Sequence, residues 1–343
     1  MSRDKPTVSP FDRSAQHDTK RAAILSQAAR LFNSKGSRAT TLQDIASTLG
    51  LTKTSLYYYV KTKEELIYQC YMAALQHHLH KMDTIESQHA QPLARAKAFF
   101  ISHFEDWLAA RESRAPYIAA LLEIASLKGP HRQEVEAIYT QMFKRLRQYL
   151  RDGIADESFR ELETTSTTRA ILGSVDWAFS WLHQVPAGRV GAVAEEAFDL
   201  LSRGLSAGQR EYHPEIRAHQ KPSGAYVKGF DREEQNRLKQ QAFYKTGTWF
   251  FNRQGFNGTS LDEIAEHLNV SKGAFYYHIK NKEDLLFHCY TYSQAAVRRI
   301  HEEALHQPCS GLGRLAYICR EVFRVQNSDD GPLIRYNTIT ALP

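Results

Sequence analysis

The chain has 343 residues, 42% of them hydrophobic and 24% charged, which is the balance of a globular protein and excludes wholesale disorder. This length suits two or more domains, and the chain has no run of about 18 uncharged apolar residues that would cross a membrane. The formal net charge of +6 favours a polyanionic partner such as nucleic acid, although only weakly on its own.

The N-terminal region lacks the features of a targeting signal. Residues 1–17 are polar and have no apolar core, so we expect a flexible arm rather than a signal peptide. No CxxC spacing occurs among the four cysteines, which are Cys70, Cys289, Cys309 and Cys319. This usage predicts a cytoplasmic location without structural disulfides or a zinc ribbon.

Residues 18–50 predict two helices. Over 18–35, apolar residues recur at spacings of three and four, as they do on one face of a helix. Gly36 is expected to end this helix in the way that a C′ glycine does. Thr41 is a suitable N-cap for a second helix over residues 42–49.

The next residues predict a short third helix and the start of a fourth. A tight turn at Gly50 leads to Thr52, the expected cap of a helix over residues 53–60. Two short helices joined by such a turn are typical of a helix-turn-helix unit. Thr62 is the expected cap of the fourth helix.

This pattern occurs twice in the chain. Residues 32–71 align with residues 251–290 without a gap, and 17 of the 40 positions are identical. A repeat offset of 219 residues is too long for a solenoid and indicates a duplicated domain. The identical pairs include Gly36 and Gly255, Ile45 and Ile264, Lys53 and Lys272, Tyr57 and Tyr276, and Lys63 and Lys282.

The rest of the chain is also predicted to be helical. Between the copies we expect helices at 92–111, 130–152, 158–183 and 189–206, and a buried apolar segment at 115–127. Residues 207–230 are polar with Pro and Gly and predict a linker. Helices near 291–306 and 311–327 follow the second copy. We therefore expect an all-α fold with helix-turn-helix units at 18–71 and 231–290, a helical domain at 72–206 and a partial one at 291–343.

The third helix carries the most specific pattern. Its sequence is Lys-Thr-Ser-Leu-Tyr-Tyr-Tyr-Val at 53–60 and Lys-Gly-Ala-Phe-Tyr-Tyr-His-Ile at 272–279, followed each time by Lys-x-Lys-Glu-(Glu/Asp)-Leu. Together with the preceding Thr-x-x-x-Ile-Ala motif, which has Ser260 in place of Thr in the second copy, this pattern resembles the DNA-binding domain of the TetR family, over residues 18–71 and 237–290. The resemblance implies operator DNA and a small, often apolar effector as partners.

A recognition helix presents its first side chains to base edges, so Lys53, Thr54 and Ser55 are the expected base readers. Leu56 and Val60, four residues apart, form a better inward stripe than consecutive tyrosines can. By the resemblance, Tyr57 contacts a base or the backbone, and Tyr59 contacts a phosphate. The expected DNA-contacting set of the first copy is Thr41, Gln43, Lys53, Thr54, Ser55, Tyr57, Tyr58, Tyr59 and Lys63.

The second copy is less basic. Residues 21–71 contain seven Lys/Arg and three Asp/Glu, whereas residues 240–290 contain five of each, so we expect weaker DNA binding by the second copy. Gly273 and Ala274 also replace the polar Thr54 and Ser55. The corresponding candidate set is Ser260, Lys272, Gly273, Ala274, Tyr276, Tyr277, His278 and Lys282. The alternative is an interaction module in which one copy, more fittingly the second, binds protein instead of DNA.

The remaining motifs give weaker evidence of function. The aromatic residues Phe100, Phe104, Trp107, Tyr117, Trp177 and Trp181 are candidates for lining a ligand cavity, although such residues at helical spacing equally form an ordinary core. The run His77-His78-Leu79-His80 lacks an obvious third ligand, so we expect no metal. No GxSxG, HExxH, P-loop or GxGxxG motif is present, and we expect neither an enzyme nor a cofactor.

By the resemblance, the helices at 158–183 and 189–206 form the interface of a homodimer. Their apolar faces can instead cover their own domain, and both roles are compatible. Only 53 residues follow Tyr290, so either the chain continues past Pro343 or the second half lacks its own pocket and dimer helices. We therefore expect a homodimer made by the first half rather than an internal pseudo-dimer. The main hypothesis is a DNA-binding repressor whose effector changes the pose of the helix that starts near Lys63.

Overall fold

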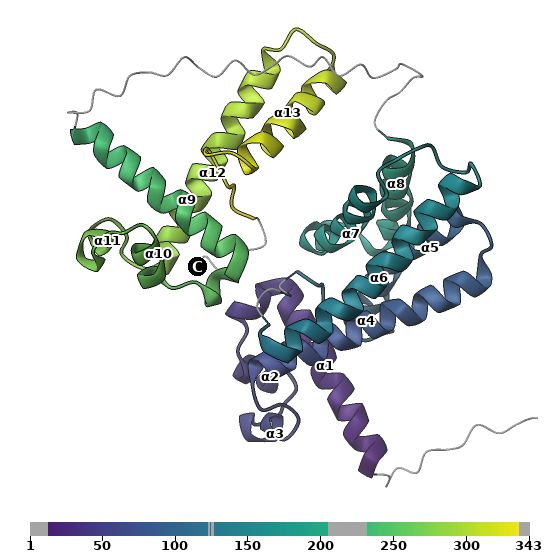
Figure 1. Cartoon of the computed structure of the whole chain (residues 1–343). Helices are drawn as coiled ribbons and strands as arrows, with labels where there is room; N and C mark the ends of the chain where they lie inside the picture. The colour runs from purple at the N-terminus through teal and green to yellow at the C-terminus, as the bar shows by residue number, and fades with distance from the viewer. Residues whose placement is uncertain (1–12, 123, 125–126, 205–231, 336–343) are drawn as a thin grey trace, which may run out of the picture. The chain divides into compact units, whose positions relative to one another are not determined.

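The computed structural model describes residues 13–122, 124, 127–204 and 232–335, and every regular element in them is a helix (Figure 1). The chain divides into two compact units, Met1–Gly204 and Leu205–Pro343. The predicted linker at 207–230 and most of the predicted arm at 1–17 lie outside the described residues. None of the described helices is long and apolar enough to span a membrane.

The first unit begins with the four predicted helices, which are α1 (Arg13–Ala39), α2 (Leu42–Thr48), α3 (Lys53–Tyr57) and α4 (Lys63–Gln88). Helix α1 starts ahead of the expected residue 18, so the end of the predicted arm is helical. It is broken at Gly36, which has φ 76°, a conformation that glycine adopts without strain.

The three predicted N-caps are present in the first unit. The side chains of Thr41, Thr52 and Thr62 each accept a hydrogen bond from the backbone N–H of the residue three positions later in the chain, at 3.1, 3.1 and 3.0 Å. Such caps satisfy N–H groups that have no partner inside the helix. The short helices α2 and α3 are therefore defined locally at their N-terminal ends.

Four more helices complete the first unit: α5 (Pro92–Arg111), α6 (Gly129–Ala155), α7 (Thr164–Trp181) and α8 (Val190–Arg203), with short 3₁₀ turns η2 (Leu182–Gln184) and η3 (Ala187–Arg189) before α8. Helix α5 packs against α6 and α8, and α4 packs against α6 (Figure 1). One hydrophobic core extends from Ile24 of α1 through Leu75 of α4 to Phe198 of α8. The helix-turn-helix part and the helical domain behind it therefore share a single core.

Several predicted boundaries in the first unit are wrong. Helix α3 ends at Tyr57 rather than at residue 60. Helix α7 begins at Thr164 rather than at 158, because the Glu163 carboxylate caps it by accepting from the N–H groups of two following residues, at 3.0 and 2.6 Å. The described part of segment 115–127 has no α-helix and is not uniformly buried, since Leu122 is 39% exposed.

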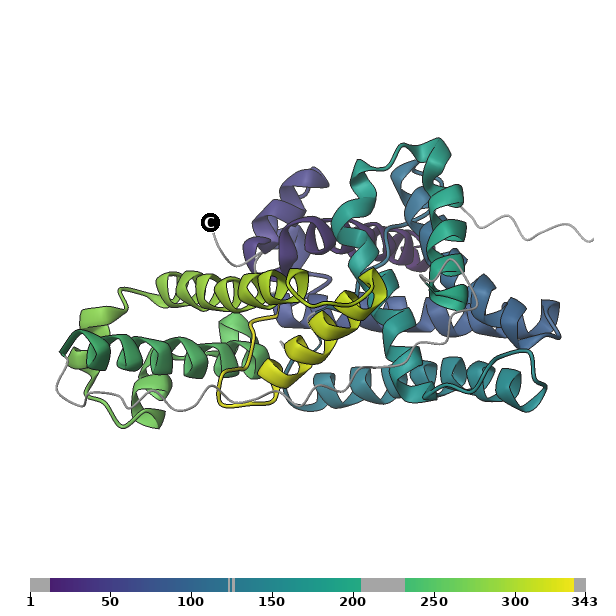
Figure 2. The same ribbon diagram turned by 90° about the horizontal axis from the view of Figure 1, so that it is seen from above.

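The second unit repeats the first in its helices, which are α9 (Arg232–Gly258), α10 (Leu261–His267), α11 (Lys272–His278), α12 (Lys282–Leu305) and α13 (Gly311–Gln326). Helix α9 is broken at Gly255, which has φ 69°, as α1 is at Gly36. Helix α12 lies alongside α9 and also packs against α13 (Figure 2). The helix predicted near 291–306 is the second part of α12, which continues without a break from Lys282.

The duplication extends to individual core contacts. The thiol of Cys70 donates to the carbonyl oxygen of Leu25 at 3.6 Å, and that of Cys289 donates to Tyr244 at 3.2 Å, the same pair of positions one repeat later. Burial raises the pKa of both thiols to about 12, so both stay protonated. All four cysteines of the chain are free thiols.

Candidate nucleic-acid interface and ligand cavity

The recognition helix α3 presents a polar side to solvent. Leu56 and Val60 are 0% and 1% exposed and anchor this segment in the core, as predicted. Lys53, Thr54 and Ser55 are all exposed in the first turn. The Ser55 hydroxyl also lies 2.9 Å from that of Thr52, so it takes part in the cap. Lys53 and Thr54 are the side chains most available to a base edge.

The three tyrosines after Leu56 have different surroundings. Tyr57 is 43% exposed and Tyr58 is 76% exposed. Tyr59 is half-buried and stacks on His17 of α1, with ring centroids 4.9 Å apart. The Lys53 ammonium lies 5.7 Å from the centroid of the Tyr57 ring, which places both on one side of the helix. Tyr57 ends α3 and the other two tyrosines follow it, and the three do not share one face.

The remaining candidates of the first copy flank α3. Thr41 is exposed and forms a capping box with Asp44, whose carboxylate accepts from the Thr41 N–H at 2.8 Å. The side chain of Gln43 donates to the Ser47 hydroxyl at 3.1 Å on the exposed side of α2. Lys63 is half-buried at the first position of α4.

In the second unit Lys272, which corresponds to Lys53 of α3, is paired with a carboxylate. The Lys272 ammonium lies 2.6 Å from the Asp262 carboxylate, and the Tyr276 hydroxyl donates to the same carboxylate at 3.4 Å. Hydrogen bonding to Asp262 raises the pKa of Lys272 and, in return, lowers that of Asp262. Gln43 stands at the equivalent position of the first unit, and no described carboxylate pairs with Lys53.

The other candidates of the second unit are also placed. Gly273 and Ala274 are exposed, as is Tyr277, which is 85% exposed. His278 is half-buried, with its ring 5.7 Å from that of Phe243. Two candidates differ from the simple expectation: Ser260 occupies the N-cap position of α10 without a side-chain cap bond, and the Lys282 ammonium donates to the Phe256 carbonyl at 3.1 Å.

A hydrogen-bond arrangement that the sequence reading missed joins the first helix of each unit to a segment far along the chain. The side-chain amide of Asn33 donates to the carbonyl of Ile118 at 2.7 Å and accepts from the N–H of Ala120 at 2.8 Å. Asn252 donates to the carbonyl of Leu333 at 2.8 Å and accepts from the N–H of Arg335 at 2.9 Å. We call these contacts the asparagine clamp. Because Asn33 and Asn252 are an identical pair in the repeat, the alignment did contain a signal for it.

We expect replacement of Asn33 by Ala to lower the free energy of unfolding by about 1–3 kcal/mol, because a half-buried carbonyl and N–H lose their partners. Asn252→Ala is expected to have an effect of the same size. Urea unfolding of the full chain measures both. Asn236→Ala, at an exposed position of α9, is the control, and equal effects of all three changes would contradict the clamp.

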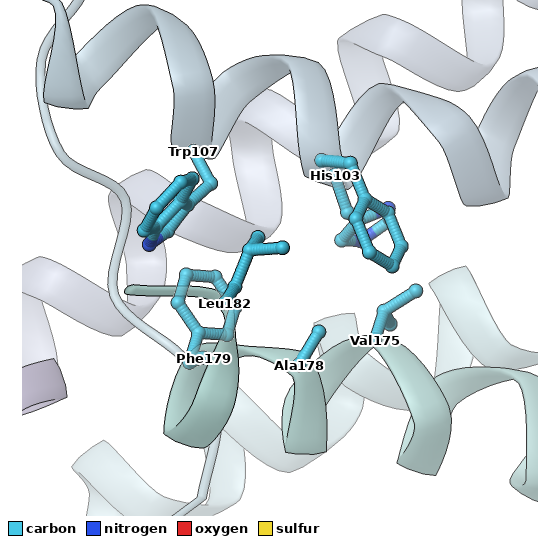
Figure 3. A pocket seen from close by; sticks show the side chains of 7 residues that line it. His103, Trp107, Val175, Ala178, Phe179 and Leu182 are labelled. Carbon is cyan, nitrogen blue, oxygen red and sulfur yellow. The ribbon is translucent and has the colours of Figure 1, made fainter. Parts of the chain in front are cut away.

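Between α5 and α7 the first unit has small cavities with aromatic walls. One is lined by His103, Phe104, Trp107, Val175, Ala178, Phe179 and Leu182, with the α5 side chains facing those of α7 and η2 (Figure 3). An adjoining cavity of about 10 Å³ is lined by His78, His103, Asp106, Trp107, Ala110, Tyr117, Ile118 and Phe179. Both are nearly filled by their own side chains.

The structure places the predicted cavity residues in different surroundings. Phe104, Trp107 and Tyr117 line these cavities. Phe100 is buried in the core against Phe198, with ring centroids 5.6 Å apart. Trp181 is half-buried, with its ring 6.5 Å from that of Phe104, and Trp177 is 46% exposed and lines neither of these two cavities. The 3.6-residue period directs Val175, Ala178 and Leu182 of this region inward and Trp177 outward.

The apolar residues predicted for the dimer helices mostly face their own unit. Ile171, Val175, Ala178 and Leu182 are at most 5% exposed. On α8, Leu200 is 49% exposed, and together with Trp177 it provides the large apolar side chains that α7 and α8 leave accessible. The alternative that these helices cover their own domain is therefore met, and a shared interface stays a prediction. No group of side chains that would hold a metal, the His77–His80 run included, occurs in the described parts of the chain.

Comparison with known families matches three segments of the chain. Residues 24–70 and 246–289 each match the model of bacterial regulatory proteins of the tetR family. Residues 89–205 match the tetracyclin repressor-like C-terminal domain. Together these matches include more than half of the chain.

Individual relatives are transcriptional regulators. The HTH-type transcriptional repressor KstR2 of Mycolicibacterium smegmatis is 26% identical over 206 residues, which are 59% of this chain and 98% of that protein. KstR2 of Mycobacterium tuberculosis is 33% identical over 90 residues, 26% of this chain and 45% of that protein. The crystal structure of the TetR family regulator PfmR from Thermus thermophilus superimposes with a TM-score of 0.44 at 30% identity, covering 59% of this chain and all of that one.

Proposed function

The chain belongs to the TetR family of bacterial transcriptional regulators, and on this premise we propose that it is a repressor whose first helix-turn-helix unit reads operator DNA and whose helical domain binds a small effector. The observation that carries the first part is the exposed first turn of α3. There Lys53 has no described acidic partner, and Thr54 lies beside it. A lysine donating to guanine and a threonine methyl packing on thymine are suitable base contacts.

The flanking residues suit phosphate contacts that position the recognition helix. Thr41 and Gln43 lie at the start of α2, and both are exposed. Tyr57 and Tyr58 are exposed on and just beyond α3. Contacts from such residues fix the orientation of a protein on the duplex, whereas base contacts carry the sequence information.

The second unit is proposed to bind DNA more weakly. Its recognition lysine is shared with Asp262, and a carboxylate at this surface also repels phosphate. The pair is exposed, so water and salt weaken it, and it lowers affinity without abolishing binding. The competing proposal for this unit, a protein partner, is favoured only by its fewer polar side chains at Gly273 and Ala274.

A reciprocal exchange tests the role of this pair. Asp262→Gln is expected to strengthen, and Gln43→Asp to weaken, binding of the full chain to a labelled duplex of random sequence by about two- to tenfold at low salt. Each change moves one unit toward the charge pattern of the other. Fluorescence anisotropy gives both affinities. Asp83→Gln, an exposed acidic residue of α4 outside α2 and α3, is the control, and an unchanged affinity for both exchanges would refute the idea.

Release by an effector is proposed to run through the two connections between cavity and DNA-binding helices. Helix α4 begins just after the recognition helix and carries His78 into the cavity. The segment with Tyr117 and Ile118 lines the same cavity and is held to α1 by Asn33. An effector that fits only one arrangement of these elements shifts the population toward it and changes the pose of the recognition helix.

We further propose a homodimer made by α7 and α8, whose exposed Trp177 and Leu200 supply apolar contacts.

The function as a whole is tested by titrating labelled duplex DNA with the full chain at increasing salt concentrations. We expect binding whose logarithm falls linearly with that of the salt concentration, because phosphate contacts release counterions. Absence of binding at low salt would contradict the proposal and favour a protein partner.

A further inference from the structure

Two histidines meet in the interior of the first unit, between α4 and α5. The rings of His78 and His103 stack with their centroids 4.5 Å apart and are nearly parallel, and both side chains are at most 9% exposed. His77 and Lys81 of α4 are both engaged with the Asp106 carboxylate, at 2.9 and 2.6 Å. The charged side chains near the two histidine rings are therefore already paired with one another.

The hydrogen-bonding state of His103 follows from its partner. Its Nδ1 lies 2.8 Å from the Phe99 carbonyl oxygen, and because a carbonyl only accepts, Nδ1 carries the proton. Burial lowers the pKa of His103 to about 4, so the ring is neutral at physiological pH and Nε2 is an acceptor. No described group donates to that Nε2 atom.

One ring nitrogen of His78 also lacks a hydrogen-bond partner. Burial, followed by the nearby His103, holds the pKa of His78 well below its usual range, so this ring is also neutral. Its Nδ1 atom is fully buried and has no hydrogen-bond partner among the described residues. A buried polar atom without a partner loses the hydration it had in water and gains nothing in return, so it is costly to fold. The pair thus offers one fixed acceptor and one adaptable ring N–H.

Both histidines line the cavity of about 10 Å³ whose other walls include Trp107, Tyr117 and Phe179. This volume corresponds to roughly one water molecule, so the space is almost closed. A larger molecule enters only if α7 or the segment around Tyr117 moves away from α4 and α5. The two histidine rings and the aromatic walls define what such a molecule must look like.

We propose that His78 and His103 are the polar anchor of the effector site, and that the effector is an uncharged hydrophobic molecule, aryl or similar in shape, carrying a hydroxyl group. The hydroxyl donates to Nε2 of His103 and accepts from the N–H of His78, so one group satisfies both rings. The inference rests on the proposed function, because it specifies the ligand of the same helical domain. It also places the ligand against α4 and the clamped segment, the two connections to the DNA-binding helices.

Other head groups fit less well. A carboxylate has no proton to donate to Nε2 of His103, and it would approach the Asp106 carboxylate that lines the same cavity. An ammonium would donate a hydrogen bond, but its charge would lie in an apolar space. The acid in the cavity wall, Asp106, already contacts two basic side chains, His77 and Lys81. A ketone accepts from His78 but leaves Nε2 of His103 without a donor. Of these four head groups, only the hydroxyl both donates and accepts without bringing a charge.

The test compares three probes of matched shape on the full chain, namely 3-phenylpropan-1-ol, 3-phenylpropanoate and propylbenzene. Calorimetric titration is expected to show the alcohol binding about tenfold or more tighter than the other two, the effect of two hydrogen bonds made away from water. In His103→Phe, which keeps the stacked ring but removes the acceptor, the advantage over propylbenzene is expected to disappear. His80→Phe, at an exposed position of α4, is the control.

Equal affinity for alcohol and hydrocarbon, tighter binding of the carboxylate, or binding of no probe would overturn the proposal and leave an ordered water as the occupant. If His103→Phe does not fold, the discrimination among the three probes by the unsubstituted chain still decides. Binding of the probe-free chain to duplex DNA is measured separately. If the probe-free chain does not bind duplex DNA, the proposed function is refuted. If it binds DNA but does not prefer the alcohol, only the assignment of His78 and His103 as the polar anchor is refuted.

Discussion

Replacing Lys53 by Ala is expected to weaken the binding of the chain to its preferred duplex by about 10- to 100-fold, because one good base contact contributes about 1–3 kcal/mol of discrimination. Lys53 is exposed in the first turn of α3, and no described acidic group competes for it. The affinity is measured by fluorescence anisotropy on a duplex selected by the unsubstituted chain. The slope of affinity against salt is expected to change little if the contact is to a base, and to fall by about one if it is to a phosphate.

Lys272→Ala provides the matched control, since the two lysines occupy the same position of the repeat. Its effect on affinity for the same duplex is expected to be smaller, because this ammonium already contacts Asp262 at 2.6 Å. A larger loss from Lys272→Ala than from Lys53→Ala would reverse the proposed ranking of the two units. Thermal unfolding of both variants is expected to be nearly unchanged, because both side chains are exposed.

Replacing Phe275 by Ala is expected to lower the free energy of unfolding of the second unit by about 3–5 kcal/mol. The Phe275 side chain is 0% exposed in a core cluster of 13 buried residues and packs against Phe243 with ring centroids 5.0 Å apart. Because small domains are only marginally stable, a loss of this size unfolds most of that unit at elevated temperature. Calorimetric unfolding of the full chain measures it as the loss of one transition.

Tyr277→Ala is the control for this prediction. Tyr277 lies on the same helix but is 85% exposed, so its replacement is expected to change stability by less than about 0.5 kcal/mol. The transition of the first unit is expected to remain, since its core is formed by its own helices. Equal effects of Phe275→Ala and Tyr277→Ala would show that α11 is not anchored in the way described.

The helix-turn-helix units were predictable because their signals are local. Thr41, Thr52 and Thr62 cap their helices as the sequence indicates, and the break at Gly36 depends on one residue with positive φ. The repeat adds a second, independent reading of the same pattern. The inward positions of Leu56 and Val60 follow from helical geometry alone.

Features set by contacts distant in sequence were not predictable in the same way. The asparagine clamp pairs Asn33 with a segment 85 residues away, so only the identity of Asn33 and Asn252 in the repeat hinted at it. The pairing of Lys272 with Asp262 needs the angle between α10 and α11, which no periodicity contains. The exposure of Trp177 shows that hydrophobicity alone does not assign a large side chain to a cavity.

The two units thus differ in ways that follow from single substitutions in a repeated scaffold. Contacts inside the scaffold occur in both units, such as the hydrogen bonds that the thiols of Cys70 and Cys289 donate to backbone carbonyls. The changes lie on the exposed surface of the helix-turn-helix units, where Asp262 of α10 replaces Gln43 of α2 and Gly273 of α11 replaces Thr54 of α3. Duplication with surface change is the simplest physical description of a chain whose second unit we expect to bind DNA more weakly than its first.

The central proposal is that the first unit reads the DNA sequence. Selection of duplexes from a random pool, followed by sequencing, tests it most directly when the full chain, Lys53→Ala and Phe275→Ala are compared. We predict that the full chain and Phe275→Ala enrich the same motif and that Lys53→Ala weakens its enrichment. Enrichment of no motif by the full chain, or loss of the motif in Phe275→Ala with its retention in Lys53→Ala, would contradict the proposal.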